Sequence, residues 1–404
     1  MQKPLAFKDV DVFDGVRMQR QKTVLVDGAT ISAVGSDLQV PAGSEIVDGS
    51  GKTLLPGLFD SHVHIEGEAS LAQSLVFGVT TVLDMFCERK TAVEMRRFSN
   101  DASRQIADLR SAITLVTAPG GHGTEYGVVI PTISGPEEAD LFVGQRLSEG
   151  SDYIKIVYDD GTAYGRPFPT IDKQTMAAVV KAAHSRGKLA MVHSLSLKFA
   201  IDSLETGADG LVHLFIDRVP DASFESLFQD DGRFVIPTLT VLESVCGVPG
   251  GAALLSETDF GEYLSEDSVK TLSTPAPKPK GVSPSYSVPK ETVGVLRRLS
   301  VPILAGSDAP NPGTTYGASI HRELYLLVQA GLTPQEALAS ATYVPAKVFG
   351  LFDRGRIAPG LRADLLMVRG DPSERIEDTR DIVGIWRLGR RVERKSPHKA
   401  DPGV

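Results

Sequence analysis

Two histidines separated by one residue end an apolar run in the stretch LLPGLFDSHVHIEG, from Leu54 to Gly67. Residues i and i+2 of a β-strand point to the same face, so His62 and His64 would project side by side while Val63 points away. Two imidazoles in this arrangement either form hydrogen bonds with other groups or bind a metal ion, and imidazole is the commonest metal ligand in proteins. The stretch alone leaves both interpretations open.

Four further polar residues end or interrupt apolar segments elsewhere in the chain: Lys155 in YIKIVY, His193 in LAMVHS, His213 in GLVHL, and Asp308 in LAGSDAPNP. Imidazole nitrogen and carboxylate oxygen are ligands that suit Zn²⁺, and less selectively Mn²⁺ or Co²⁺. For Asp308 the alternative is the start of a turn, because aspartate shortly before asparagine and proline commonly begins one. The meaning of these residues depends on whether the fold brings them together.

The segments that carry these residues alternate with helical patterns along the middle of the chain. The strand-like runs are GLFDSHVH, TTVLDM, AITLVTA, YIKIVYD, LAMVHS, GLVHL, FVIPTLTVL and PILAGSDA, and helical runs such as DKQTMAAVVKAAHSRG lie between most of them. Eight strands alternating with helices predict an α/β fold, a distorted (β/α)8 TIM barrel. Catalytic groups of such barrels lie at the C-terminal ends of the strands, so the six polar residues are expected to converge at one mouth.

Both ends of the chain differ from this middle and are typical of short β-strands with tight turns. A hairpin around an Asp-Gly pair is predicted in KTVLVDGATISAVG, and RADLLMVRGD and IVGIWRLGRRVE are strand-like. We therefore predict a small β-sandwich domain formed by residues 1–53 and 356–404, and a barrel formed by residues 54–355. A segment near residues 249–289, rich in Ser, Pro and Lys, follows the seventh strand and is expected to cover the substrate as an irregular excursion.

Lys155 is the most informative of the six residues. Its neighbours Ile154 and Ile156 should face the outer helices, which directs Lys155 into the barrel. An ammonium group there, close to four imidazoles, would be repelled and poorly solvated. Reaction with CO₂ would convert the amine to an anionic carbamate whose two oxygens can bridge two metal ions. The alternatives are a lysine that extends to solvent at the mouth and an ion pair with Asp308.

The composition indicates the class of protein, the partners and the compartment that suit this chemistry. The chain has 404 residues, of which 42% are hydrophobic and 23% charged, as in an ordinary globular protein. The net charge of −9 disfavours nucleic acid and anionic membranes as partners. Two cysteines make no disulfide framework, and neither a signal peptide nor a membrane-spanning run is apparent. We expect a cytoplasmic protein that acts on a small molecule. The sequence is also compatible with a homo-oligomer.

The combined motifs resemble the amidohydrolase superfamily, in particular its prolidase-like and imidazolonepropionase-like metal-dependent hydrolases. Matching stretches cover nearly the whole chain and include LLPGLFDSHVH, the strand lysine, AMVHS, GLVHL, AGSDA, GRIAPGLRADLLMV and GASIHRELYLLVQAGLTPQEALASATYVPAKVFGL. The resemblance implies two divalent metal ions, usually zinc. The implied ligands form two sets and a bridge: His62, His64 and Asp308 for the first ion, His193 and His213 for the second, and carboxylated Lys155 with a hydroxide between them.

The resemblance also implies the reaction. The metal ions give a hydroxide that attacks an amide carbonyl, and Asp308 passes the proton to the leaving nitrogen. The substrate would then contain an amide or related acyl–nitrogen bond, as N-acyl and dipeptide-like compounds do. The run KLAMVHS lacks the tyrosine that carboxypeptidase-like members place before this histidine, which disfavours a C-terminal amino acid as substrate. The residues expected to contact the substrate are His122 in GGHG, Tyr126, Tyr158 and Arg166.

The sequence is also compatible with three other functions. A mononuclear deaminase of the same superfamily would lack the bridging lysine and usually carry a glutamate near the fifth or sixth strand, whereas no glutamate closely follows His193 or His213. An imidazolonepropionase-like hydrolase would open a cyclic amide. A catalytically silent binding protein would typically have lost ligands, whereas this chain keeps all six positions.

Overall fold

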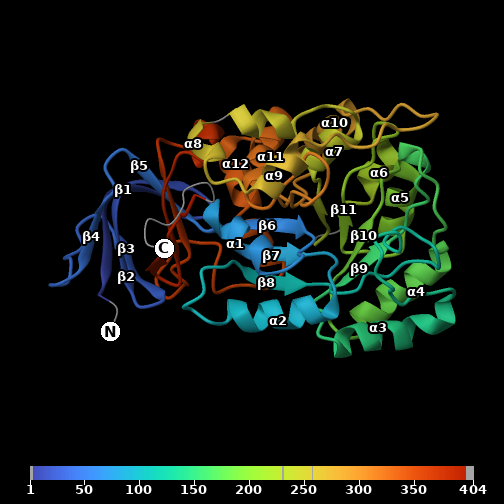
Figure 1. Cartoon of the computed structure of the whole chain (residues 1–404), viewed down its shortest axis with the longest axis horizontal. Coiled ribbons are helices and arrows are strands. Elements are labelled where there is room, and N and C mark those ends of the chain that lie inside the picture. Colours follow the sequence, from blue (N-terminus) through green and yellow to red (C-terminus); the bar gives the residue numbers. More distant parts are fainter. Residues whose placement is uncertain (1–2, 230–231, 257, 397–404) are drawn as a thin grey trace.

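The structure is a computed structural model of the chain, and it describes residues 3–229, 232–256 and 258–396. Two parts lie side by side (Figure 1). A β-sheet at the left is built from the blue N-terminal and red C-terminal ends of the chain, and a larger unit of strands surrounded by helices lies to its right. Within these residue ranges, every helix is too short or too polar to cross a lipid bilayer.

The strands of the two chain ends form one hydrogen-bonded sheet, in the order β15-β14-β13-β5-β1-β2-β3, with β4 paired to β1. Strand β5 lies between N-terminal β1 and C-terminal β13, which confirms the prediction of a small β unit shared by both ends. Phe7 and Trp386 pack edge to face in its core, with ring centroids 4.7 Å apart. The strands are β1 (Leu5–Phe13), β2 (Met18–Asp27), β3 (Thr30–Gly35), β4 (Glu45–Asp48), β5 (Lys52–Pro56), β13 (Leu365–Arg369), β14 (Ile382–Arg387) and β15 (Arg390–Arg391).

Seven short parallel strands and an irregular eighth segment line the barrel. Strands β6, β7 and β8 form one sheet and β9, β10, β11 and β12 form another. Isolated parallel bridges join these elements, and they pair Val116 with Ile156, Val235 with Ile303, and Val63 with Ala309. Among the described residues continuous ladders do not close the ring, so the predicted (β/α)8 barrel is confirmed in a distorted form. The strands are β6 (Leu58–Val63), β7 (Val79–Asp84), β8 (Asp108–Ser111), β9 (Ile154–Val157), β10 (Ala190–His193), β11 (Gly210–Val212) and β12 (Phe234–Ile236).

Helices α4, α5, α6, α9 and α12 begin at a residue whose side chain caps the first turn. At the start of α4, the Asp172 carboxylate accepts a hydrogen bond from the Thr175 N–H at 2.7 Å, and Met176 of that helix shares an apolar cluster with Ile156 of β9. The α-helices are α1 (Glu68–Val76), α2 (Arg89–Ser99), α3 (Ala139–Ser148), α4 (Lys173–His184), α5 (Leu197–Glu205), α6 (Ala222–Ser226), α7 (Leu239–Val245), α8 (Thr258–Gly261), α9 (Glu266–Ser273), α10 (Ser287–Arg298), α11 (Ala318–Gln329), α12 (Pro334–Ser340) and α13 (Tyr343–Val348). Short 3₁₀ turns are η1 (Pro136–Glu138), η2 (Thr162–Tyr164), η3 (Gly251–Ser256) and η4 (Ile376–Arg380).

The segment near residues 249–289 is partly helical, although its composition predicted an irregular excursion. Its first half forms η3, α8 and α9, because its apolar residues find partners on α1, α11 and the turn after α1. Residues 274–286 are irregular and largely exposed. This irregular part lies against the loop after β9, since a Cβ atom on Gly165 would lie 2.4 Å from the Lys280 carbonyl oxygen. The apolar cluster of the first half contains Leu254, Phe260, Leu264, Leu272, Phe77 and Ala318.

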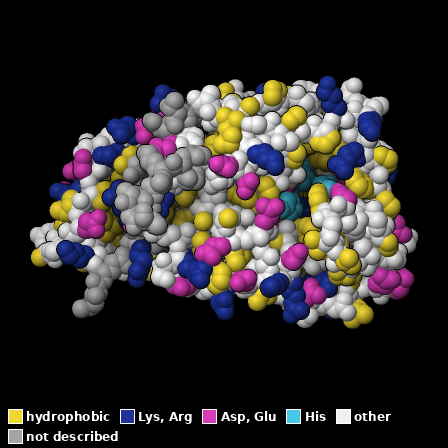
Figure 2. Space-filling model, in the orientation of Figure 1, with side chains coloured by type: hydrophobic (Ala, Val, Ile, Leu, Met, Phe, Trp, Pro, Cys, Tyr) yellow, Lys and Arg dark blue, Asp and Glu magenta, His cyan; other side chains and the backbone are white. Residues whose placement is uncertain are grey.

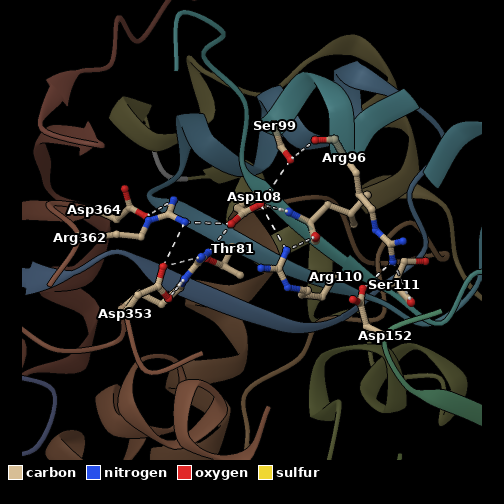
Figure 3. Close-up of polar contacts among 12 residues, drawn as sticks. Thr81, Arg96, Ser99, Asp108, Arg110, Ser111, Asp152, Asp353, Arg362 and Asp364 are labelled. Atoms are coloured by element: carbon tan, nitrogen blue, oxygen red, sulfur yellow. Dashed lines mark hydrogen bonds and ion pairs between the residues drawn. The ribbon is translucent and has the colours of Figure 1, made fainter. Parts of the chain in front are cut away.

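A buried ion-pair cluster joins the barrel to the chain that returns into the sheet (Figure 3). Asp108, at the start of β8, contacts the guanidinium groups of Arg354 and Arg362, the latter at 3.1 Å. Arg362 also pairs with Asp364 at 2.8 Å. Burial alone would raise the pKa of Asp108, but the two arginines hold it well below its ordinary value. The cluster therefore carries a charged carboxylate at the end of the strands opposite to the mouth.

We expect Asp108→Asn to lower the free energy of unfolding by about 3–5 kcal/mol, because two buried guanidinium groups lose a charged partner. The pKa of Asp108 is lowered on folding, so its stabilisation is present above about pH 4 and is lost as the pH falls further. Urea unfolding at neutral and at acidic pH measures both effects. Glu68→Gln is the control, since it breaks an exposed pair with Arg104 and should change stability by less than about 1 kcal/mol. Equal stability of Asp108→Asn and the parent at neutral pH would contradict the expectation.

Candidate metal centre

The C-terminal ends of the barrel strands open on a hollow in the surface, and histidine side chains are visible in it (Figure 2). The structure brings all six predicted ligands to this mouth. Five of them are buried, and the side chain of His64 is partly exposed. The ligands come from separate elements: His62 and His64 from β6 and its end, Lys155 from β9, His193 from β10, His213 from the end of β11, and Asp308 from the eighth segment.

Asp308 lies at the centre of this cluster. Its Oδ1 atom is 3.2 Å from His62 Nε2 and 3.1 Å from His64 Nε2, and its Oδ2 atom is 3.9 Å from His213 Nε2. Burial would raise the pKa of Asp308, but the neighbouring His64 and His213 side chains hold it below its ordinary value. Asp308 and His213 both have positive φ angles, of 56° and 69°. Such strained backbone clusters at functional sites.

Asp60 fixes the first strand against the segment that carries Asp308. Its carboxylate accepts hydrogen bonds from the Ser307 N–H at 2.9 Å, the Ser307 hydroxyl at 2.5 Å and the His62 N–H at 3.2 Å. These bonds set the spacing between a histidine ligand and the central carboxylate. Sequence analysis did not single out Asp60, although its spacing in FDSHVH puts it on the same strand face as His62 and His64.

His193 and His213 lie next to one another at the ends of β10 and β11. Their rings meet edge to face with centroids 4.6 Å apart, and the His213 ring is 4.8 Å from that of His62. His213 Nδ1 lies 2.6 Å from the Thr238 hydroxyl, which donates its own proton to the Pro237 carbonyl at 2.8 Å. The hydroxyl therefore accepts from Nδ1–H, which leaves Nε2 of His213 unprotonated toward Asp308.

Lys155 is buried in the barrel interior, as the alternation of β9 predicted. Its neighbours Ile154 and Ile156 belong to the apolar cluster formed with the outer helices. Burial lowers the pKa of Lys155 to about 7, and the charges of Asp308 and Asp84 oppose this shift. A substantial fraction of the amine is therefore neutral at physiological pH, and the neutral amine is the form that can react with CO₂.

The donor set fits a divalent metal ion. Ligand atoms of His62, His213 and Asp308 all lie within 4.8 Å of one another. Buried His193 Nε2 and Asp308 Oδ1 have no hydrogen-bond partner within the part of the chain that the structure describes. Burial also lowers the pKa of His62, His193 and His213, so these imidazoles are neutral, as metal coordination requires.

The predicted substrate contacts divide into two groups. The His122 ring lies beside His193, with the two ring centroids 4.9 Å apart, and its Nδ1 atom is 2.6 Å from Glu125 Oε1. Tyr126 packs edge to face on His122, and Arg166 lies over Phe168, which also contacts His122. These three candidates therefore surround one part of the mouth.

Tyr158 lies apart from this group. Its ring packs edge to face on Phe199, and its hydroxyl donates to the Asp202 carboxylate at 3.3 Å, so it belongs to the contact between β9 and α5. Tyr158 has the same parity as Ile154 and Ile156, which face outward. The geometry does not favour Tyr158 as a substrate contact.

Comparisons with known proteins place this geometry in a family. The model of the amidohydrolase family matches residues 53–392. Imidazolonepropionase from Cereibacter sphaeroides is 24% identical over 410 residues and covers 93% of each chain. A putative prolidase from Bifidobacterium longum superimposes with a TM-score of 0.78 and 23% identity, covering 98% of this chain and 96% of the other. A Xaa-Pro dipeptidase with bound methionine has a TM-score of 0.76 and 22% identity, covering 97% and 100%.

The chain belongs to the amidohydrolase family, because the family model covers well over half of it. The protein is accordingly an enzyme, a metal-dependent hydrolase that acts on an amide-type carbon–nitrogen bond. The family, the fold class and the reaction class expected from the sequence are confirmed at this level.

Proposed function

We propose that the protein is a binuclear hydrolase, with zinc as its metal, that cleaves an amide bond in a small molecule. The observation that supports this most strongly is the convergence of six ligand-type side chains from separate barrel elements at one mouth. Bound there, two divalent ions would polarise the amide carbonyl and lower the pKa of the attacking water. The proposed ligands are His62, His64 and Asp308 for one ion, His193 and His213 for the other, and carboxylated Lys155 for both.

Lys155 supplies the bridging group in this proposal. Its neutral amine adds to the carbon of CO₂ and loses one proton, which gives a carbamate with one negative charge and two oxygen atoms. The lowered pKa of Lys155 and its burial among neutral imidazoles support this chemistry, because an ammonium group is poorly solvated there.

Asp308 is the general base and then the general acid in this proposal. Its Oδ1 atom faces the Nε2 atoms of His62 and His64, which suits a ligand atom, while Oδ2 is farther from its nearest imidazole nitrogen. Because the pKa of Asp308 is below its ordinary value, the carboxylate is ionised at neutral pH. Its Oδ2 atom would accept the proton of the attacking water and then donate it to the leaving nitrogen.

The remaining mouth residues would orient the substrate. His122 is held through Nδ1 by Glu125, which leaves its second nitrogen for a ligand, and Tyr126 and Arg166 flank it. An aromatic ring, a phenol and a guanidinium suit a substrate that carries a polar acyl group beside its amide. The relatives named imidazolonepropionase and prolidase make cyclic amides and dipeptide-like compounds the first classes to test.

The experiment that tests the proposed function is a hydrolysis screen of the zinc-loaded enzyme. The panel comprises N-acyl amino acids, dipeptides, aryl amides, carbamates, cyclic amides, and lactones as oxygen analogues. We expect turnover of at least one amide class and loss of that turnover after metal removal. Activity confined to release of ammonia from amino-substituted rings would contradict the proposal and support a deaminase.

We also propose a cytoplasmic location. Cys87 and Cys246 are both free thiols, and Cys87 is buried. Unpaired thiols suit a reducing compartment.

We expect the irregular segment at residues 274–286 to help select the substrate. Its Lys280 backbone lies against Gly165, next to Arg166, and the Ser285 N–H donates to the Ile216 carbonyl in the loop after β11 at 3.0 Å. The segment is therefore held against two loops of the mouth. Replacing residues 275–283 with a shorter Gly/Ser linker should change KM and the order of preferred substrates, while metal content stays constant.

A Gly/Ser replacement of the exposed turn at residues 41–44, which connects β3 to β4 in the part formed by the chain ends, is the control for this experiment. It should leave KM and substrate preference unchanged. If the shortened 275–283 variant also keeps the KM and preferences of the parent, the segment is only a connector.

A further inference from the structure

Thr238 connects the proposed metal ligand His213 to helix α7. Its hydroxyl lies 2.6 Å from His213 Nδ1 and 2.8 Å from the Pro237 carbonyl oxygen. Thr238 is fully buried and has a left-handed backbone conformation, with φ of 50° and ψ of 47°, which a β-branched residue rarely adopts. Such a conformation persists only where surrounding contacts hold it. The contacts that hold Thr238 therefore also set the His213 ring.

Glu323 of α11 supplies contacts of this kind. Its fully buried carboxylate accepts hydrogen bonds from the Leu239 N–H at 2.9 Å, the Thr240 N–H at 2.8 Å and the Thr240 hydroxyl at 2.7 Å. Leu239 and Thr240 begin α7, and the first N–H groups of a helix have no partner within it. Thr238 is the N-cap residue but forms no side-chain cap, because its hydroxyl is engaged elsewhere. Glu323 thus accepts the hydrogen bonds that a capping side chain would accept, so the Thr238 hydroxyl can bond to His213 instead.

We propose that Glu323 is a positioning residue for the metal centre and acts through Thr238 on His213. The inference rests on the proposed function, because it takes His213 as a metal ligand. By holding the first turn of α7, Glu323 keeps the Thr238 hydroxyl in place as the acceptor of the Nδ1 proton. Nε2 of His213 then carries the lone pair and faces Asp308. A hydrogen bond to the second nitrogen of a metal-binding histidine fixes both the tautomer and the orientation of its ring.

Two substitutions interrupt this series of contacts at different points. Glu323→Gln keeps the shape of the side chain but cannot accept hydrogen bonds at both terminal atoms. Thr238→Val keeps the branched shape but removes the acceptor, and Thr238→Ser restores a hydroxyl as the rescue variant. Glu243→Gln is the matched control, since buried Glu243 lies farther along α7 and pairs with Arg322 at 2.9 Å instead of capping the first turn.

The test compares these variants in the full-length protein by three measurements. ¹⁵N chemical shifts of His213 in the metal-free protein report the tautomer, Zn²⁺ titration gives the Kd, and thermal unfolding reports stability. The parent should show His213 protonated at Nδ1. Glu323→Gln and Thr238→Val should mix the tautomers and raise the Kd for Zn²⁺ by about 10–100-fold. Thr238→Ser and Glu243→Gln should leave tautomer and Kd unchanged, even where Glu243→Gln lowers the unfolding temperature.

Combining Glu323→Gln with Thr238→Val separates an effect through Thr238 from an independent one. The double variant should bind Zn²⁺ no more weakly than Thr238→Val alone, because both changes remove the same contact. Additive losses would overturn the inference, and so would an unchanged tautomer and Kd in Glu323→Gln or an equal loss in Glu243→Gln. Failure of the parent to bind Zn²⁺ would contradict the proposed function instead, and the tautomer in the metal-free protein would still decide the role of Glu323.

Discussion

Replacing Asp308 with asparagine is expected to lower kcat by about 10²–10⁴-fold while much of the bound metal is retained. The amide oxygen of asparagine can still act as a weak ligand beside His62 and His64, but the side chain cannot accept and return a proton. Steady-state kinetics across the pH range and elemental analysis of the same preparation measure the two effects. We therefore expect kcat of Asp308→Asn to fall far more than its metal content.

Asp364→Asn is the control for that variant, because Asp364 pairs with Arg362 at the opposite end of the barrel. It should alter stability but leave kcat of the folded enzyme close to that of the parent. Near-normal turnover of Asp308→Asn at all pH values would show that another group carries the proton.

Removal of the Lys155 amine is expected to abolish detectable turnover and to reduce the number of metal ions bound. Lys155→Met should fold well, because an apolar side chain replaces a buried and poorly solvated amine. Lys155→Ala leaves space in the same place, so formate or acetate should restore part of its activity by replacing the lost carbamate oxygens. Metal content and turnover with and without added carboxylate measure this effect.

Formate and acetate should not increase the activity of the parent or of Asp308→Asn, which is the control for the rescue. Electron density from a crystal of the metal-loaded parent should show a carboxylated side chain at position 155. An unmodified ammonium in that crystal would contradict the carbamate.

Residues placed by strand alternation could be predicted from the sequence. The spacing of His62 and His64, and of Lys155 between Ile154 and Ile156, fixes a face once the strand is recognised. The mouth of the barrel then brings together side chains that are up to 246 residues apart in the chain, because parallel strands all end on one side. The same alternation also places Tyr158 outward, on the side of Ile154 and Ile156, which argues against the predicted contact with the substrate.

Contacts that depend on packing between distant segments could not be predicted in this way. Asp60 and Glu323 act on backbone N–H groups of Ser307 and Leu239, and backbone groups leave no pattern in the sequence. The helical first half of the segment near residues 249–289 is stabilised by apolar contacts with α1 and α11, which its Ser- and Pro-rich second half obscured. The union of all terminal strands in a single sheet likewise depends on the pairing of β5 with β13.

The number of divalent metal ions per chain at full activity tests the central claim most directly. Elemental analysis of the purified enzyme, paired with turnover during stepwise reconstitution of the metal-free protein with Zn²⁺, gives this number. Six converging ligands, one of them able to bridge, predict about two ions per chain, with activity completed only when the second ion binds. Full activity with a single ion would contradict the binuclear site.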